Sequence, residues 1–218
     1  MRDFFSMDGT LFRFLSKVAD IMILNLLFIL CCLPVVTIGA AVTALSYVTL
    51  KMKDQEEGYI WRSFFQSFKQ NFGQATVIWL IMLVLGAVLG VDLWLTGAMQ
   101  GNMQLLMRVC VGAGILVWLM VFLYVFPLQS RFYNTIGITM KNALLLAIGN
   151  FPRTACMILV MIGAAVLTVW NNMTFWYGIL VWLMFGFAAI AWINSQLLYG
   201  IFAKLMPEEA AASDQAEQ

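Results

Sequence analysis

The residues that usually carry out enzyme chemistry are few in this sequence, and histidine is absent. Histidine is the commonest metal ligand and the commonest general base, so its absence removes much of the catalytic repertoire. The cysteines show neither a CxxC pair nor another ligand spacing, and we interpret them as small apolar side chains on helix surfaces. They are Cys31, Cys32, Cys110 and Cys156. We therefore expect no metal site and no cofactor.

The acidic residues do not form a general acid and base pair. Asp54, Glu56 and Glu57 lie in one short charged run, which is typical of a solvated turn before a helix. No serine is accompanied by a histidine, and no glycine-rich loop fits a phosphate group. The sequence predicts a protein that is not an enzyme and has no catalytic residues.

Asp92 and Arg108 form the one candidate polar pair. Carboxylates inside a membrane often mark ion or proton paths. Asp92, however, lies at the outer end of an apolar stretch beside Trp94, and this favours an ordinary interfacial position. Arg108 begins the next apolar stretch, so the two side chains can pair across a short connection.

Three amides lie within or at the ends of apolar stretches: Asn25, Asn194 and Gln196. In a membrane such side chains join helices by hydrogen bonds worth about 1 kcal/mol or less. We favour this structural use over substrate binding.

Two patterns of small residues predict close helix packing. Gly86 and Gly90 form a GxxxG pair, and Gly39 and Thr43 lie on one small-residue face. Such residues let two helix backbones approach each other in a membrane. Neither pattern indicates a ligand.

The composition excludes a soluble domain. Hydrophobic residues make up 63% of the chain and charged residues 11%, whereas soluble domains are about half apolar and about a quarter charged. The basic residues are scattered and the net charge is +1, so nothing indicates nucleic-acid binding. We expect a multi-pass protein of the plasma membrane, surrounded by the lipid bilayer.

Stretches without charge define the expected membrane spans, because a charged side chain at mid-bilayer costs at least about 2.5 kcal/mol. The stretches are Ile21 to Leu50, Gln70 to Val91, Val109 to Ser130 and Thr154 to Ala203. A span needs about 20 residues, so the second and third stretches are one helix each. The last is a hairpin, with its turn at residues 170–174.

The first stretch breaks at Pro34, because proline removes a backbone donor and disfavours helix at the preceding residue. We expect one helix from about Val18 to Leu33 and a second from about Ile38 to Met52. The second helix either crosses the membrane or re-enters it. The expected fold is therefore an all-α transmembrane bundle, with six spans as the first choice and five spans plus a re-entrant segment as the second.

Basic residues indicate which connections are cytoplasmic. They gather in two connections and after the last span: Lys51, Lys53, Arg62 and Lys69, then Arg131, Lys141 and Arg153, and finally Lys204. We expect these connections and the C-terminus to be cytoplasmic. Arg2, Arg13 and Lys17 favour the same side for the start of the chain, so an even number of crossings is favoured. Residues 1–206 are predicted to form a single membrane domain, and 207–218 a disordered acidic tail. A signal peptide ending at Ala44 is formally compatible, but the apolar run is longer than an ordinary signal requires.

An aromatic stripe lies in the first cytoplasmic connection. Its residues recur at helical spacing: Trp61, Phe64, Phe65, Phe68 and Phe72. Such a helix either lies in the membrane interface or extends the following span and packs its rings on neighbouring helices. In both arrangements the helix has a structural role.

The stretches LPVVTIGAAVTALSYVTLKM and EEGYIWRSFFQSFKQNFGQA resemble the YesL-like family of membrane proteins from Gram-positive bacteria, whose function is unknown. The similarity is strongest from about Asp20 to Trp79. It implies an association with ABC sugar-transporter permease subunits, because genes of the family often lie beside those of carbohydrate ABC transporters. The resemblance supplies no catalytic or binding residues.

The leading hypothesis is a non-catalytic accessory or regulatory component of carbohydrate uptake. The alternative is a small transporter or permease in its own right, which should enclose polar side chains at mid-membrane. A third hypothesis, a protein that acts on lipids or on envelope stress, predicts no sugar phenotype.

Overall fold

The computed structural model describes residues 10–52, 59–98 and 100–216, and every regular element in these ranges is helical. The first half contains α1 (Thr10–Cys32), the 3-10 turn η1 (Val35–Thr37), α2 (Ile38–Lys51) and α3 (Ile60–Thr96). The second half contains α4 (Asn102–Arg131), α5 (Ile136–Gly149), α6 (Phe151–Val169), α7 (Asn172–Val181), the π-helix η2 (Trp182–Gly186) and α8 (Phe187–Ala216). The predicted all-α class is confirmed.

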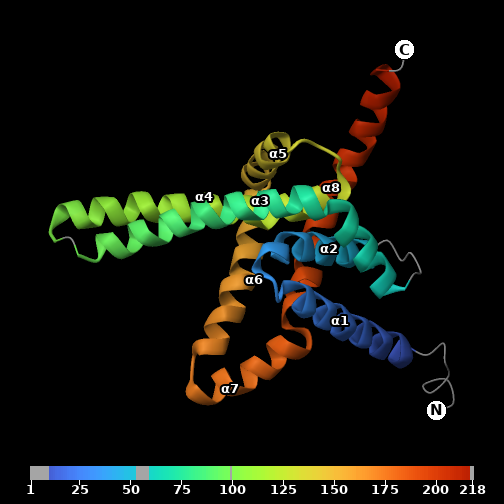
Figure 1. Ribbon diagram of the computed structural model, residues 1–218, viewed down its shortest axis with the longest axis horizontal. Helices are drawn as coiled ribbons and strands as arrows, with labels where there is room; N and C mark the ends of the chain where they lie inside the picture. Colours follow the sequence, from blue (N-terminus) through green and yellow to red (C-terminus); the bar gives the residue numbers. More distant parts are fainter. Residues whose placement is uncertain (1–9, 53–58, 99, 217–218) are drawn as a thin grey trace.

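The short helix α2 lies at the centre of the molecule, where it packs against α1, α3, α4 and α8 (Figure 1). Its small residues permit this position, since Gly39, Ala40, Ala41, Thr43 and Ala44 are all buried. The most extensive contact is with α3. Small side chains allow such close approach of helix backbones, and α2 therefore holds the other helices together.

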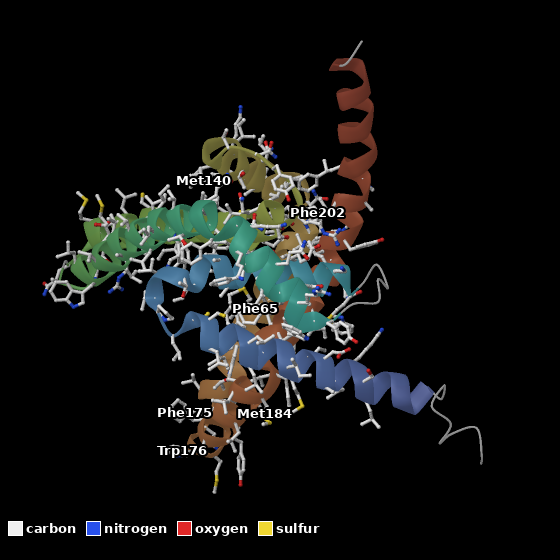
Figure 2. All side chains as sticks on the ribbon, turned by 45° about the vertical axis from the view of Figure 1, so that its right-hand side comes forward. Phe65, Met140, Phe175, Trp176, Met184 and Phe202 are labelled. Atoms are coloured by element: carbon white, nitrogen blue, oxygen red, sulfur yellow. The ribbon has the colours of Figure 1, made fainter. Side chains whose placement is uncertain are left out.

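Two helical hairpins extend from this centre in different directions, one formed by α3 and α4 and the other by α6 and α7 (Figure 1). Figure 2 shows Phe175 and Trp176 of α7 near the outer end of the second hairpin. The two hairpins have a large exposed apolar surface, with Leu105, Leu159 and Leu167 each more than two-thirds exposed. This surface suits hydrocarbon rather than water.

Among the described residues, five helices are long and apolar enough to cross a membrane: α1, α3, α4, α6 and the continuous run from α7 through α8. In the most apolar window of each helix, at most 28% of the residues are buried within the protein. The chain is thus a multi-pass membrane protein, because most of this apolar surface needs a lipid environment. The helix α2 has 14 residues, or about 21 Å at 1.5 Å per residue, so its crossing stays a prediction.

The predicted break at Pro34 is confirmed. The helix α1 ends at Cys32, and Pro34 has an extended backbone (φ −79°, ψ 120°) before the turn at Val35–Thr37. The hydroxyl of Thr37 donates to the carbonyls of Cys31 and Pro34, at 2.5 and 2.7 Å. The first bond satisfies a carbonyl in the last turn of α1, and the second adds to the bond that the carbonyl of Pro34 accepts from the backbone N–H of Thr37 at 3.0 Å.

The aromatic stripe does not form a separate interfacial helix, because α3 runs without interruption from Ile60 to Thr96. Phe64 is fully buried beside α2, whereas Trp61 is 57% exposed. The stripe therefore extends the following span and packs part of its rings inside the protein, which is the second of the two arrangements considered from the sequence. A single Gly73 does not end the helix, since one glycine costs only about 1 kcal/mol.

The predicted turn in the last apolar stretch is confirmed, and one helix was not anticipated. The turn lies between Val169 and Asn172, where Asn171 and Thr174 form a capping box. The unanticipated helix is α5, in the basic connection between Arg131 and Arg153. The helix α8 extends to Ala216, into the segment 207–218 for which the sequence predicts disorder. The division of the chain at residue 206 stays a prediction.

Candidate functional site

Asn25 of α1 joins the first apolar stretch to the last one. Its side chain is fully buried, and its Nδ2 donates to the carbonyls of Trp182 and Leu183 at 3.0 and 2.8 Å. Its Oδ1 accepts a hydrogen bond from the backbone N–H of Ala188 at 3.0 Å. The amide thus satisfies three backbone groups at the π-helix η2, where the regular hydrogen-bond ladder is interrupted. The interhelical role predicted for Asn25 is confirmed.

The π-helix is fixed on its other side by Trp182. The indole Nε1 of Trp182 donates to the hydroxyl of Thr168 on α6 at 2.8 Å. A Cβ atom at Gly186 would lie 2.8 Å from the Trp182 ring, so this position has no room for a side chain. The irregular segment is consequently held between α1 and α6.

A cavity of about 310 Å³ lies between α1, α2, α3, α4, α6 and α8, and Phe187, the residue after this segment, is part of its wall. Most of its wall is apolar and aromatic, including Phe122, Met157, Met161 and Phe187. Its polar lining residues are Ser46, Thr49, Asn194 and Ser195, and no lining residue is ionisable. A ligand pocket is typically apolar with a few polar groups that fix orientation, which makes this cavity the candidate binding site.

The three hydroxyl groups of the cavity already have partners. Ser46 donates to the carbonyl of Val42 at 2.8 Å, and Thr49 donates to the carbonyl of Ser46 at 3.1 Å. Ser195 bonds the carbonyl of Trp192 at 2.7 Å and lies 3.3 Å from that of Thr49. These bonds leave the hydroxyl hydrogens engaged with helix carbonyls.

Asn194 differs from these hydroxyl residues. It is 8% exposed, and its Oδ1 is buried without a hydrogen-bond partner. Buried polar groups nearly always have a partner, so an orphaned acceptor calls for an explanation. Asn194 is therefore the most distinctive polar group of the cavity.

A second polar group joins α3 to α4. The Nε2 of Gln129 donates to the Oδ1 of Asn71 at 3.3 Å, and the Nδ2 of Asn71 donates to the carbonyl of Ser67 at 3.1 Å. Nearby, the hydroxyls of Tyr124 and Thr154 lie 2.9 Å apart and join α4 to α6. The sequence offered a signal for these contacts, since each is a polar residue in or beside an apolar stretch.

The candidate polar pair, Asp92 and Arg108, lies near the tip of the α3–α4 hairpin, at the end of α3 and the start of α4. The proposed pairing stays a prediction. Gln196 bonds only the carbonyl of Trp192 in its own helix, at 3.5 Å, so the interhelical bond expected for it is not formed.

The packing residues have different environments. A Cβ atom at Gly39 would lie 2.5 Å from the Cβ of Trp79, and Thr43 is fully buried one turn away. Gly86 lies against the Trp118 ring, at 3.1 Å from a Cβ built there, whereas Gly90 has nothing within 4 Å. Close packing is therefore found at Gly39 and Gly86, but Gly90 does not take part.

The cysteines are free thiols, half-buried at Cys31 and Cys32 and exposed at Cys110 and Cys156. Within the described ranges, no group of three or more histidine, cysteine or acidic side chains is arranged to hold a metal ion.

Residues 21–93 match a family model described as a protein of unknown function, DUF624. The match covers about a third of the chain, from α1 through the Pro34 turn and α2 into α3. It overlaps the region in which the sequence resembles the YesL-like family. No curated protein and no solved structure matches the chain. These findings fit a membrane protein of unknown function.

Proposed function

We propose that the protein is a non-catalytic accessory or regulatory component of carbohydrate uptake in the plasma membrane. In this role it contacts ABC sugar-transporter permease subunits through its helices, with its basic connections and C-terminus in the cytoplasm. The carbohydrate part of the proposal rests on the resemblance of residues 20–79 to the YesL-like family. The non-catalytic part rests on the lining of the cavity, which contains no ionisable residue.

The apolar cavity is the observation that favours an accessory protein over a sugar carrier. A sugar has many hydroxyl groups, and each one that enters a dry site without a partner loses its hydrogen bonds to water. The cavity offers Asn194 and three hydroxyls that are already bonded to helix carbonyls. Such a site does not compensate a sugar for the loss of water.

The outer surface supports contacts with other membrane helices. The α3–α4 hairpin exposes large side chains along its length, including Val84 and Val88, and it also exposes two glycines, Gly90 and Gly112, with nothing within 4 Å of a Cβ atom built on either. In a membrane, helices associate through packing and small residues rather than through the hydrophobic effect. A permease helix is therefore a suitable partner for this surface.

Affinity purification tests the proposal. Membranes from cells grown on a plant polysaccharide are treated with a cross-linker, and tagged protein is purified beside an unrelated tagged polytopic protein as control. We expect ABC permease subunits with the tagged protein and not with the control. If cross-linking recovers no permease subunit, the accessory role is contradicted. Oligosaccharide uptake by proteoliposomes that contain this protein alone would instead establish the small-transporter alternative.

A further inference from the structure

We propose that α1 and α2 form a re-entrant hairpin, which enters the bilayer from the side of the basic connections and turns back near its middle. In this arrangement neither α1 nor α2 crosses the membrane, and the turn at residues 33–36 contacts the acyl chains of lipids. The crossings are then made by α3, α4, α6 and the run from α7 through α8. The hairpin does not depend on the role in carbohydrate uptake.

The helix α3 gives a scale for depth in the membrane. Its apolar part lies between the charged residues Lys69 and Asp92, which are about 35 Å apart at 1.5 Å per residue, enough to cross the hydrocarbon. Trp79 lies near the middle of this part, and its Nε1 donates to the carbonyl of Val35 at 2.9 Å. A Cβ atom at Gly39, at the start of α2, would lie 2.5 Å from the Cβ of Trp79. The turn between α1 and α2 is therefore level with the middle of the apolar part of α3.

The apolar parts of α1 and α2 are too short to cross from this depth to the opposite side and back. At 1.5 Å per residue, α1 rises about 18 Å from Asp20 to Cys32 and α2 rises about 20 Å from Ile38 to Lys51. Each length is between half and two-thirds of the hydrocarbon thickness of about 30 Å. A complete crossing by α1 would place Asp20 within the hydrocarbon, where a charged side chain is disfavoured. The helix α2 instead runs back along the first half of α3 (Figure 1), toward the side of Lys69.

The turn itself suits hydrocarbon. It exposes three large apolar side chains, with exposed fractions of 74%, 58% and 51%: Leu33, Val35 and Val36. Irregular backbone at membrane depth needs hydrogen-bond partners from the protein, since lipid supplies none. Here the hydroxyl of Thr37 donates to the carbonyls of Cys31 and Pro34, and the indole of Trp79 donates to the next carbonyl. The turn thus presents apolar side chains outward while its carbonyls are bonded inward.

Spin labelling measures the depth of the turn. In the full-length protein without its native cysteines, a nitroxide is attached to Val36→Cys, Leu80→Cys or Trp94→Cys, and each variant is reconstituted in liposomes. All three positions are exposed, with Leu80 beside Trp79 and Trp94 at the outer end of α3. Oxygen concentrates in the middle of the bilayer, whereas a nickel chelate stays in water. We expect the label at Val36 to be as deep as that at Leu80, and about 15 Å deeper than that at Trp94, or half of the hydrocarbon thickness.

An impermeant maleimide separates the re-entrant hairpin from the two other arrangements. If both helices cross, Val36→Cys lies at the outer surface and reacts in intact cells. If α1 crosses and α2 re-enters from outside, Lys17→Cys reacts in intact cells. The re-entrant hairpin predicts that Lys17→Cys reacts only after the membrane is permeabilised and that Val36→Cys reacts in neither condition. Leu33→Cys, in the same turn, repeats both measurements if Val36→Cys does not fold.

Several results would overturn the proposal. A label at Val36 as shallow as that at Trp94 would contradict the position of the turn, and so would reaction of Val36→Cys or Lys17→Cys in intact cells. A label at Val36 that neither oxygen nor the nickel chelate reaches would show that protein covers the turn, which contradicts its contact with lipid.

Discussion

At the scale of single residues, buried amides determine how distant parts of the chain are joined. Asn25 bonds three backbone groups at η2, which lies about 160 positions later in the sequence. The sequence shows that an amide within an apolar stretch needs a partner. It does not show which helix supplies the partner, because the π-helix leaves no recognisable pattern in residues 182–186.

Replacement of Asn25 tests this junction. Asn25→Leu keeps the approximate volume but leaves the backbone groups of η2 without their partner, so we expect a loss of about 1–2 kcal/mol in the free energy of unfolding. The measurement is unfolding by sodium dodecyl sulfate in mixed micelles. Gln196→Leu is the control, because Gln196 bonds only its own helix, and its effect should be within about 0.5 kcal/mol. Equal effects of the two changes would contradict the junction.

At the scale of elements, the positions of proline and of the charged residues in the sequence predicted most helices correctly. Pro34 separates α1 from α2 as expected, and the two asparagines at 171–172 coincide with the turn before α7. Two elements were harder to anticipate. Ile136–Gly149 forms α5 because Thr139, Ala143 and Ala147 give it a narrow buried face, a weaker signal than a long apolar run. Phe64 of α3 is buried against α2, which is a tertiary contact that the sequence does not show.

The aromatic segment gives a test of that contact. Phe64→Ala removes a fully buried ring, so we expect a loss of about 3–5 kcal/mol of stability, as for other buried phenylalanines. Trp61→Ala removes a ring that is more than half exposed and should change stability much less. Both can be measured by thermal unfolding in detergent. If Phe64→Ala is as mild as Trp61→Ala, the ring does not pack inside the protein.

The contact between α2 and α3 provides a second test at this scale. Gly39→Ala places a Cβ atom against the backbone of Ala75 and the Cβ of Trp79, so the two helices must separate and the Tm should fall by several degrees. Gly90→Ala introduces the same group where nothing lies within 4 Å, and it should leave stability unchanged or raise it by up to about 1 kcal/mol. A matching drop in both variants would show that α2 does not pack closely on α3.

At the scale of the whole molecule, the chain is organised around a short buried helix with long apolar helices around it. The helix α2 is surrounded by α1, α3, α4 and α8 rather than by lipid, and helices enclosed by protein need not match the bilayer thickness. The class of the protein could be predicted from composition alone. The directions of the two hairpins could not, because they depend on which faces of the central helices meet.

The sidedness of the basic connections is the central claim of this account, and cysteine labelling of intact cells measures it directly. In a variant without the four native cysteines, single cysteines replace Arg62, Lys141 and Asn171, and an impermeant maleimide is added outside. We predict that Asn171→Cys reacts in intact cells, whereas Arg62→Cys and Lys141→Cys react only after the membrane is permeabilised. Labelling of Arg62→Cys or Lys141→Cys in intact cells would contradict the account.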